Sequence, residues 1–165
     1  MPHGVKVHHN QVYVCDFHNN RIQVFDLELS FITSFGSEGT GKGQYDRPND
    51  LAFDSQGNIY VSEYGNNRVH VLDVPQPAVK SMPGKLNCPE GIHVANNCVY
   101  LSDCDNDCIA VFQLSGEFLA SFGKEGRGRG EFRHPRGIVF DCGGYCYVCD
   151  QLNHHTINII NYNYC

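Results

Sequence analysis

Four copies of one pattern run through this chain of 165 residues. A repeat limits the fold strongly, because every copy must form the same structural unit. Each copy opens with a proline, and the four prolines are separated by 46, 41 and 46 residues: Pro2, Pro48, Pro89 and Pro135. This period is typical of a propeller blade of four strands, and it excludes the shorter helical and leucine-rich repeats.

The residues inside each copy predict strands. Short β-branched and aromatic stretches, such as Val12-Tyr-Val-Cys and Ile22-Gln-Val-Phe, alternate with polar turn residues. We name the four strands of a copy a to d. In the second copy we expect strands a to c at Leu51–Phe53, Ile59–Ser62 and Val69–Leu72. Strand d is expected at Phe31–Phe35, at Phe118–Phe122 and near Val79–Met82.

An acidic residue opens the loop between strands b and c of every copy: Asp16, Glu63, Asp103 and Asp150. We expect each carboxylate to accept backbone amide hydrogens of its own loop, which is a structural role. Asn and Asp follow in the same loops, where they tolerate a left-handed backbone conformation.

Taken together, Pro-x-Gly-apolar, Gly-Asn-Ile-Tyr-Val, Asn-Asn-Arg-Ile/Val-x-Val and Ser-Phe-Gly closely resemble the NHL repeat. The resemblance covers essentially the whole chain and implies an all-β fold, a β-propeller of four-stranded antiparallel blades. About four NHL blades are expected in a single segment, 1–165, forming a partial, open propeller. The repeats are expected at approximately 2–36, 37–84, 85–123 and 124–165.

This sequence departs from the family pattern in two ways. The loop arginine is present as Arg21 and Arg68, but Cys108 and His155 replace it in the third and fourth copies. The fourth copy lacks a strand d, whereas NHL propellers resemble closed rings of about five or six blades. We therefore expect a fragment, a truncated product or a subunit that needs further blades, with open blade edges that favour self-association.

The most suggestive candidate binding segment is the glycine-rich loop 123–136. Five cationic residues outnumber two acidic ones there, in a chain whose formal net charge is −6. Arginine grips phosphate and carboxylate groups bidentately, so this loop would suit an acidic partner or an RNA backbone. The matching loop 36–47 has the same glycine framework without net charge, so only the arginine density is special.

In NHL propellers the b–c loops and the loops that join consecutive blades share one face, the top face. The resemblance implies that this face binds the ligand. The candidate contacts are Arg47, Tyr64, Asn66, Asn67, Arg68, Lys124, Arg127, Arg129, Arg133 and Arg136.

The nine cysteines and nine histidines do not predict a metal site. Cys104-x-x-x-Cys108 and Cys142-x-x-x-Cys146 lack the paired Cys-x-x-Cys spacing of structural zinc sites. Cys15 and Cys149 align with Ser62 and Ser102, which indicates a small, semi-buried strand position. A zinc lyase resembling NHL propellers would need several imidazoles on inner strands, and only His93 is expected there. We therefore expect no metal, no cofactor and no catalytic residues.

The chain contains neither an apolar stretch long enough to span a bilayer nor a basic and apolar start typical of a signal peptide. These observations predict a cytoplasmic protein with reduced thiols and no membrane contact.

The leading functional hypothesis is an interaction scaffold that binds a protein partner or RNA, resembling the substrate-recognition propeller of TRIM-NHL ubiquitin ligases. A RING domain is absent from this sequence, so ligase activity would lie elsewhere. Two alternatives stay open. One is an extracellular or sensor NHL propeller, or a lyase-like zinc propeller enzyme, and the other is a truncated fragment without function.

Overall fold

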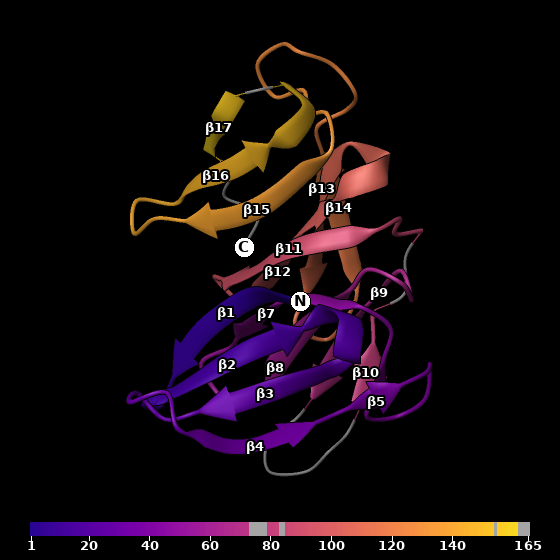
Figure 1. Cartoon of the computed structure of the whole chain (residues 1–165). Coiled ribbons are helices and arrows are strands. Elements are labelled where there is room, and N and C mark those ends of the chain that lie inside the picture. The colour runs from indigo at the N-terminus through magenta and orange to yellow at the C-terminus, as the bar shows by residue number, and fades with distance from the viewer. Residues whose placement is uncertain (73–78, 83–84, 154, 162–165) are drawn as a thin grey trace.

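The chain forms four antiparallel sheets, one for each sequence copy (Figure 1). The computed structural model describes residues 1–72, 79–82, 85–153 and 155–161, and it describes the side chains of these residues except 79–81 and 155–161. Blade 1 contains β1 (Pro2–His8), β2 (Gln11–Asp16), β3 (Arg21–Phe25) and β4 (Phe31–Phe35). Blade 2 contains β7 (Pro48–Phe53), β8 (Ile59–Glu63), β9 (Arg68–Leu72) and β10 (Val79–Ser81).

Blade 3 contains β11 (Pro89–Ala95), β12 (Cys98–Asp103), β13 (Cys108–Gln113) and β14 (Phe118–Phe122). Blade 4 has three strands among the described residues, which are β15 (Pro135–Phe140), β16 (Tyr145–Asp150) and β17 (His155–Asn161). Short 3-10 turns open the b–c loops of blades 1, 3 and 4: η1 (Phe17–Asn19), η2 (Cys104–Asn106) and η3 (Gln151–Asn153). A small parallel pair, β5 (Ser37–Glu38) with β6 (Gln44–Tyr45), lies in the loop between blades 1 and 2.

The predicted propeller fold is confirmed, including its strand order. Strand d lies at Phe31–Phe35 and Phe118–Phe122 as expected, and the faint strand of the second copy is β10. Strands run in sequence order across each sheet, as they must in a blade built from consecutive hairpins. None of the helices among the described residues has the length and apolar character needed to span a membrane.

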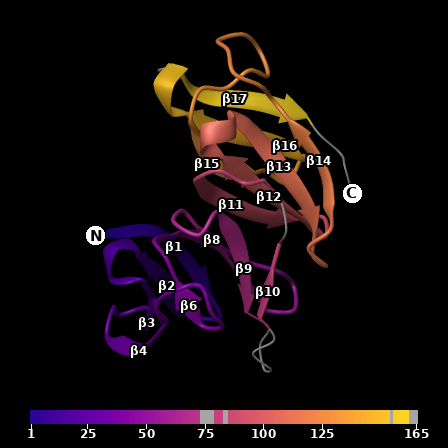
Figure 2. The ribbon, with the colours of Figure 1, turned by 90° about the vertical axis from the view of Figure 1, so that its right-hand side faces the viewer.

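The first strands of the four blades lie side by side and line the inner edge of the arc. β7 packs between β1 and β11, and β11 packs between β7 and β15. The blades fan outward from these inner strands, so that blades 1 and 4 lie at opposite ends of the molecule (Figure 2). The arrangement is an open arc rather than a closed ring.

At two junctions the inner strands approach so closely that glycine is required, at Gly4 and at Gly91. A Cβ added to Gly91 would lie 2.2 Å from the carbonyl oxygen of Arg136 in the next blade. Register shifts follow the opening proline in every blade, as between Pro89 and Ile92. The Pro-x-Gly start of the repeat therefore has a packing reason, which is close contact between consecutive inner strands.

Three apolar clusters form the core, one at each junction between neighbouring blades. Leu51 and Val61 of blade 2 pack against Ile22 of blade 1, and comparable clusters join blades 2 and 3 and blades 3 and 4. Burying a single Leu, Ile or Val side chain stabilises a fold by about 1.5–3 kcal/mol. Stability therefore resides mainly between blades, as in other repeat proteins.

Equivalent residues show that both ends of the arc are uncovered. Val5 is 56% exposed, whereas its counterparts in the next three blades, Leu51, Ile92 and Ile138, are buried. At the other end, Cys149 is exposed, although its counterparts Cys15, Ser62 and Ser102 are fully buried. The expectation of a semi-buried position is therefore wrong for Cys149, because no described blade packs against that face of blade 4.

One hydrogen bond recurs at every junction on the loop side of the blades. The side chains of Asn20, Asn67 and Asp107 accept the backbone N–H of Arg47, Cys88 and His134 of the next blade, at 2.8 Å in each case. All six residues have positive φ, between 52° and 59°. The acceptors are Asn or Asp, which adopt this left-handed conformation more readily than other residues with side chains.

We predict that Asn67→Gly lowers the free energy of unfolding by about 1 kcal/mol, the usual net contribution of one hydrogen bond. Glycine keeps the left-handed backbone and removes only the acceptor, whereas Asn67→Asp keeps both and is the matched control. Urea unfolding followed by circular dichroism measures the difference. Equal stability of Asn67→Gly and the parent chain would contradict a contribution of this bond.

Candidate functional site

The four b–c loops and the loops that join consecutive blades are hydrogen-bonded to each other, so they share one face, as expected for the top face. In blades 2, 3 and 4 the acidic residue of the b–c loop is the centre of this contact, whereas Asp16 of blade 1 accepts from Asn19, Arg21 and Gln23 of its own blade. Glu63, Asp103 and Asp150 accept the backbone N–H of Asp46, Asn87 and Arg133 from the loop that enters their own blade. These backbone donors belong to the entering loop, whereas the sequence predicted backbone donors of the b–c loop itself; the role is structural, as expected.

An asparagine three residues after each acidic residue completes the link. Asn66, Asn106 and Asn153 each donate to that carboxylate and also to a carbonyl oxygen of the entering loop, which belongs to Gly39, Lys85 and Gly126 respectively. Asn66 and Asn67 were candidate ligand contacts. The structure places both in bonds that hold the top face together.

Arg68 is also engaged within the protein. Its guanidinium donates to Glu63 at 2.7 Å and to the carbonyl oxygens of Thr40 and Gln44. The side chain of Arg68 is only 18% exposed, and that of Glu63 is fully buried. This candidate contact therefore braces the loop between blades 1 and 2.

Replacing the arginine has an electrostatic consequence. Burial disfavours ionisation of Glu63, but hydrogen bonds from His70, Arg68 and Asn66 outweigh it and hold the pKa of Glu63 below its ordinary value. In blade 3, where Cys108 replaces the arginine, burial raises the pKa of Asp103 because the hydrogen bonds it receives do not compensate. Blade 3 lacks both the guanidinium and the imidazole donor, because Cys108 and Ala110 stand where blade 2 has Arg68 and His70, and the nearby Asp105 raises the pKa of Asp103 further.

A cavity of about 430 Å³ opens beside Cys108. Asp103 and Lys85 lie at its polar side, while Phe112 and Phe118 contribute apolar walls. In blade 2 the corresponding position is occupied by Arg68, so this cavity lies where blade 3 lacks its arginine.

We predict that Arg68→Ala lowers the free energy of unfolding by about 3 kcal/mol at pH 7, since a buried carboxylate loses its cation. Arg68→Lys is the control that keeps the positive charge and loses the planar guanidinium with its several N–H donors. Because the pKa of Glu63 is lowered on folding, this contribution is present at neutral pH and is lost as the pH falls through the folded pKa. Denaturant unfolding at pH 7 and below pH 4 tests both statements, and a difference that persists unchanged in acid would contradict them.

We predict that Cys108→Arg stabilises the chain by about 1 kcal/mol at pH 7 by pairing with Asp103. The raised pKa of Asp103 means that the parent blade gains stability from protonation at low pH and loses it as the pH rises through that pKa. The variant should reverse this trend. Cys108→Met, which fills the cavity without charge, should leave the trend intact, and thermal unfolding across pH distinguishes the two.

The glycine-rich loop 123–136 joins blades 3 and 4, and we call it the basic loop. Its base is packed on a buried side chain, and two of its arginines are exposed at its outer edge, or rim. Phe132 is fully buried beneath it, and a Cβ added to Gly123 would lie 2.4 Å from that ring. Lys124 pairs with Glu131 at 3.3 Å. Arg133 lies 3.9 Å from Glu125. Arg127 and Arg129 are exposed and form none of the ion pairs found among the described residues.

Tyr64 lies on the top face near the junction of blades 2 and 3. The guanidinium of Arg47 lies 5.0 Å from the centre of its ring, and a hydrogen bond with Cys88 raises the pKa of the Tyr64 hydroxyl. The ring is therefore already covered by a cation and its hydroxyl is already bonded.

A polar cavity of about 460 Å³ follows the inner strands, and of its lining residues only Arg136 was among the predicted ligand contacts. Arg136 reaches Glu90 at 3.3 Å across this cavity, and Lys6 lies 3.9 Å from Asp50. Asp50 takes the place of the usual glycine, and burial raises its pKa. The Asp at this point of the repeat was the other sequence signal for the site.

Histidines also lie on inner strands, contrary to the expectation that His93 would be the sole one. His3 and His8 both belong to β1. His3 is hydrogen-bonded to Asn49 and stacks on Phe17, whereas His93 stacks on Phe140. These imidazoles have separate neighbours and do not converge on one point.

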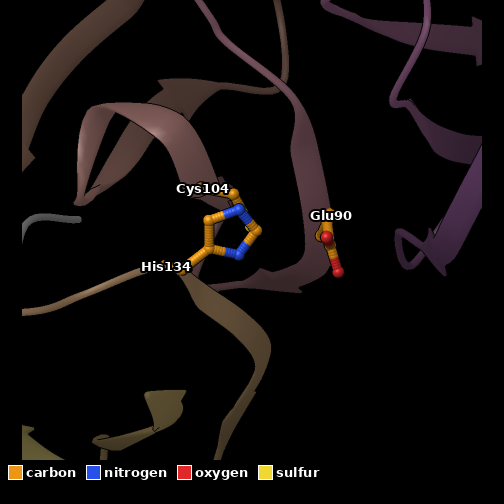
Figure 3. A group of neighbouring side chains, drawn as sticks. All are labelled: Glu90, Cys104 and His134. Atoms are coloured by element: carbon orange, nitrogen blue, oxygen red, sulfur yellow. The ribbon is translucent and has the colours of Figure 1, made fainter. Parts of the chain in front are cut away.

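Among the described residues, one mixed cluster brings together groups that bind metals. Glu90, Cys104 and His134 offer ligand atoms that all lie within 4.8 Å of one another (Figure 3). Sequence spacing concealed this cluster, because Cys104 was compared with Cys108 and its actual neighbours come from two other segments. Seven described cysteines are free, and Cys98 is disulfide-bonded, so the expectation of reduced thiols is wrong for Cys98.

Comparison with known proteins supports the repeat and the fold. The NHL repeat model matches residues 1–25 and 45–72, which belong to the first two copies. A streptogramin B lyase structure superposes with a TM-score of 0.76 at 18% identity, over 97% of this chain and 51% of the lyase. An inactive virginiamycin B lyase from Staphylococcus aureus, solved with quinupristin, gives 0.75 at 18% identity, over 97% of this chain and 52% of that one.

A nidogen/laminin complex matches 73% of this chain and 46% of the solved chain, with a TM-score of 0.62 and 17% identity. The chain thus spans about half the length of the solved structures it resembles. No curated protein matches it significantly in sequence. At these identities the likeness establishes the propeller fold alone.

Proposed function

We propose that this chain is a partner-binding arc of a β-propeller, and that its top face recognises an acidic segment of another protein. The observation that carries the proposal is that some residues of the basic loop hold it in place, whereas two of its arginines are left for a ligand. Its base is fixed by Phe132, and its other cations are paired, but Arg127 and Arg129 remain exposed at the rim. Exposed arginines on a fixed loop suit carboxylate recognition.

A protein partner is favoured over RNA by the state of Tyr64. Recognition of single-stranded RNA relies on aromatic rings that stack on bases. The ring of Tyr64 is instead covered by Arg47, and its hydroxyl is bonded to Cys88. RNA binding through phosphates alone is therefore the second outcome to be tested.

The wider assignment extends this proposal. Propellers with this repeat serve as interaction scaffolds, and a nidogen/laminin complex is among the structural neighbours. We propose that the arc is non-catalytic, and that in a longer protein of TRIM-NHL type it would select the substrate of a ubiquitin ligase. The uncovered Val5 and Cys149 faces support completion by further blades or by a second copy.

Charge reversal at the rim tests the binding surface. We predict that Arg127→Glu with Arg129→Glu weakens binding of a fluorescent polyglutamate peptide at least about tenfold, because two attractive charges become repulsive. Lys42→Glu is the matched control, since Lys42 is exposed between two glycines in the equivalent loop 36–47. Fluorescence anisotropy at several salt concentrations measures the affinities.

Equal affinities of the parent chain and the double variant would overturn the assignment of the basic loop. Tighter binding of a polyuridine probe than of the peptide, with a steep dependence on salt, would assign the same surface to nucleic acid.

A further inference from the structure

The strongest unassigned feature is the cluster of Glu90, Cys104 and His134, named the junction cluster below. Its members come from three segments: Glu90 from the start of β11, Cys104 from η2, and His134 from the loop just before β15 (Figure 3). Two belong to blade 3, and the third lies at the entrance of blade 4. Neither the proposed recognition of an acidic partner nor the core packing accounts for this convergence.

We propose that the junction cluster binds a zinc ion and thereby clamps blade 3 to blade 4. A thiolate, an imidazole and a carboxylate are the three side-chain ligand types that zinc takes in proteins. Their ligand atoms lie within 4.8 Å of each other. Tetrahedral coordination at bond lengths of about 2.0–2.3 Å needs ligand atoms roughly 3.5 Å apart, so the cluster would contract by about 1 Å.

The His134 imidazole is oriented in the way that is common for histidines that bind a metal. Its Nε2 lies 3.0 Å from a carboxylate oxygen of Asp105, while Nδ1 is buried without a hydrogen-bond partner. A carboxylate on one ring nitrogen commonly orients a histidine whose other nitrogen binds a metal. The backbone N–H of His134 is bonded to Asp107, which fixes the residue at the junction.

The other two groups are buried and partly committed. The Cys104 thiol is fully buried and donates to the carbonyl oxygen of Pro135. One carboxylate oxygen of Glu90 lies 3.3 Å from Arg136, which leaves its second oxygen for a metal. The charged groups around the cluster are Glu90, Asp105 and Asp103 against Arg136, and a thiolate would add another negative charge.

Binding must displace a proton from the thiol. Burial raises the pKa of Cys104, with the nearby Glu90 carboxylate adding to the effect. Zinc coordinates the thiolate, so the metal has to compete with this proton, and affinity should increase with pH. Coordination would replace the hydrogen bond from Cys104 to Pro135, which already crosses the blade junction, with metal–ligand bonds across the same junction.

The test uses the purified full chain under reducing conditions, with Co²⁺ as a spectroscopic probe and Zn²⁺ as its competitor. We expect one equivalent of Co²⁺ to give a thiolate-to-cobalt charge-transfer band that Zn²⁺ abolishes, together with release of a proton. Zn²⁺ at 100 times its Kd should stabilise the fold by about 2.7 kcal/mol. Thermal unfolding with and without the metal measures this stabilisation.

Two variants separate the junction cluster from other thiols. Cys104→Ser keeps a hydroxyl donor for Pro135 and should lose the band and the stabilisation. Cys108→Ser, in the same hairpin, should retain both. Glu90→Gln keeps the shape of the side chain and should weaken Co²⁺ binding at least tenfold.

A band that persists in Cys104→Ser would place the metal at another thiol and overturn the proposal. The absence of both band and stabilisation in the folded parent chain would overturn it as well. These outcomes are independent of peptide binding by Arg127 and Arg129, which lie outside the junction cluster.

Discussion

The hydrogen bond that joins consecutive blades sets the geometry of the whole arc. A left-handed Asn or Asp of one blade captures the amide of the residue before the proline that opens the next blade. The proline then starts the inner strand, and Gly4 and Gly91 let two of these strands approach the next one closely. Because the hydrogen bond recurs at three junctions, the blades take a common spacing, and the binding loops lie on one face.

Within blades 2, 3 and 4, a buried carboxylate holds the loop that enters the blade. The residue that pairs with this carboxylate determines the local electrostatics. Glu63 has Arg68, and the loop above it is fully braced. Asp103 has Cys108 instead, together with a cavity and a raised pKa. The changes from Arg68 to Cys108 and from His70 to Ala110 therefore alter the local electrostatics while the backbone of the blade is retained.

Much of the fold could be predicted from sequence, because strand pattern, turn residues and period all indicate the same blade. The bounds of β4 and β14 coincide with the two phenylalanines that begin and end each strand. The functional site was harder to predict from the sequence. Asn67 and Arg68 look like exposed loop residues until the entering loop is placed above them. Glu90, Cys104 and His134 lie far apart in the chain, and only the packing of blade 3 against blade 4 makes them neighbours.

The bond between blades also has a direction. Each of the three described junctions uses the left-handed acceptor of one blade and the pre-proline donor of the following blade, so the two faces of a blade are different. A blade that extends the arc must join head to tail, which is a heterologous contact. Two copies could complete a ring only with a two-fold axis along the propeller axis, and a pairing of like ends would leave the recurring bond unused.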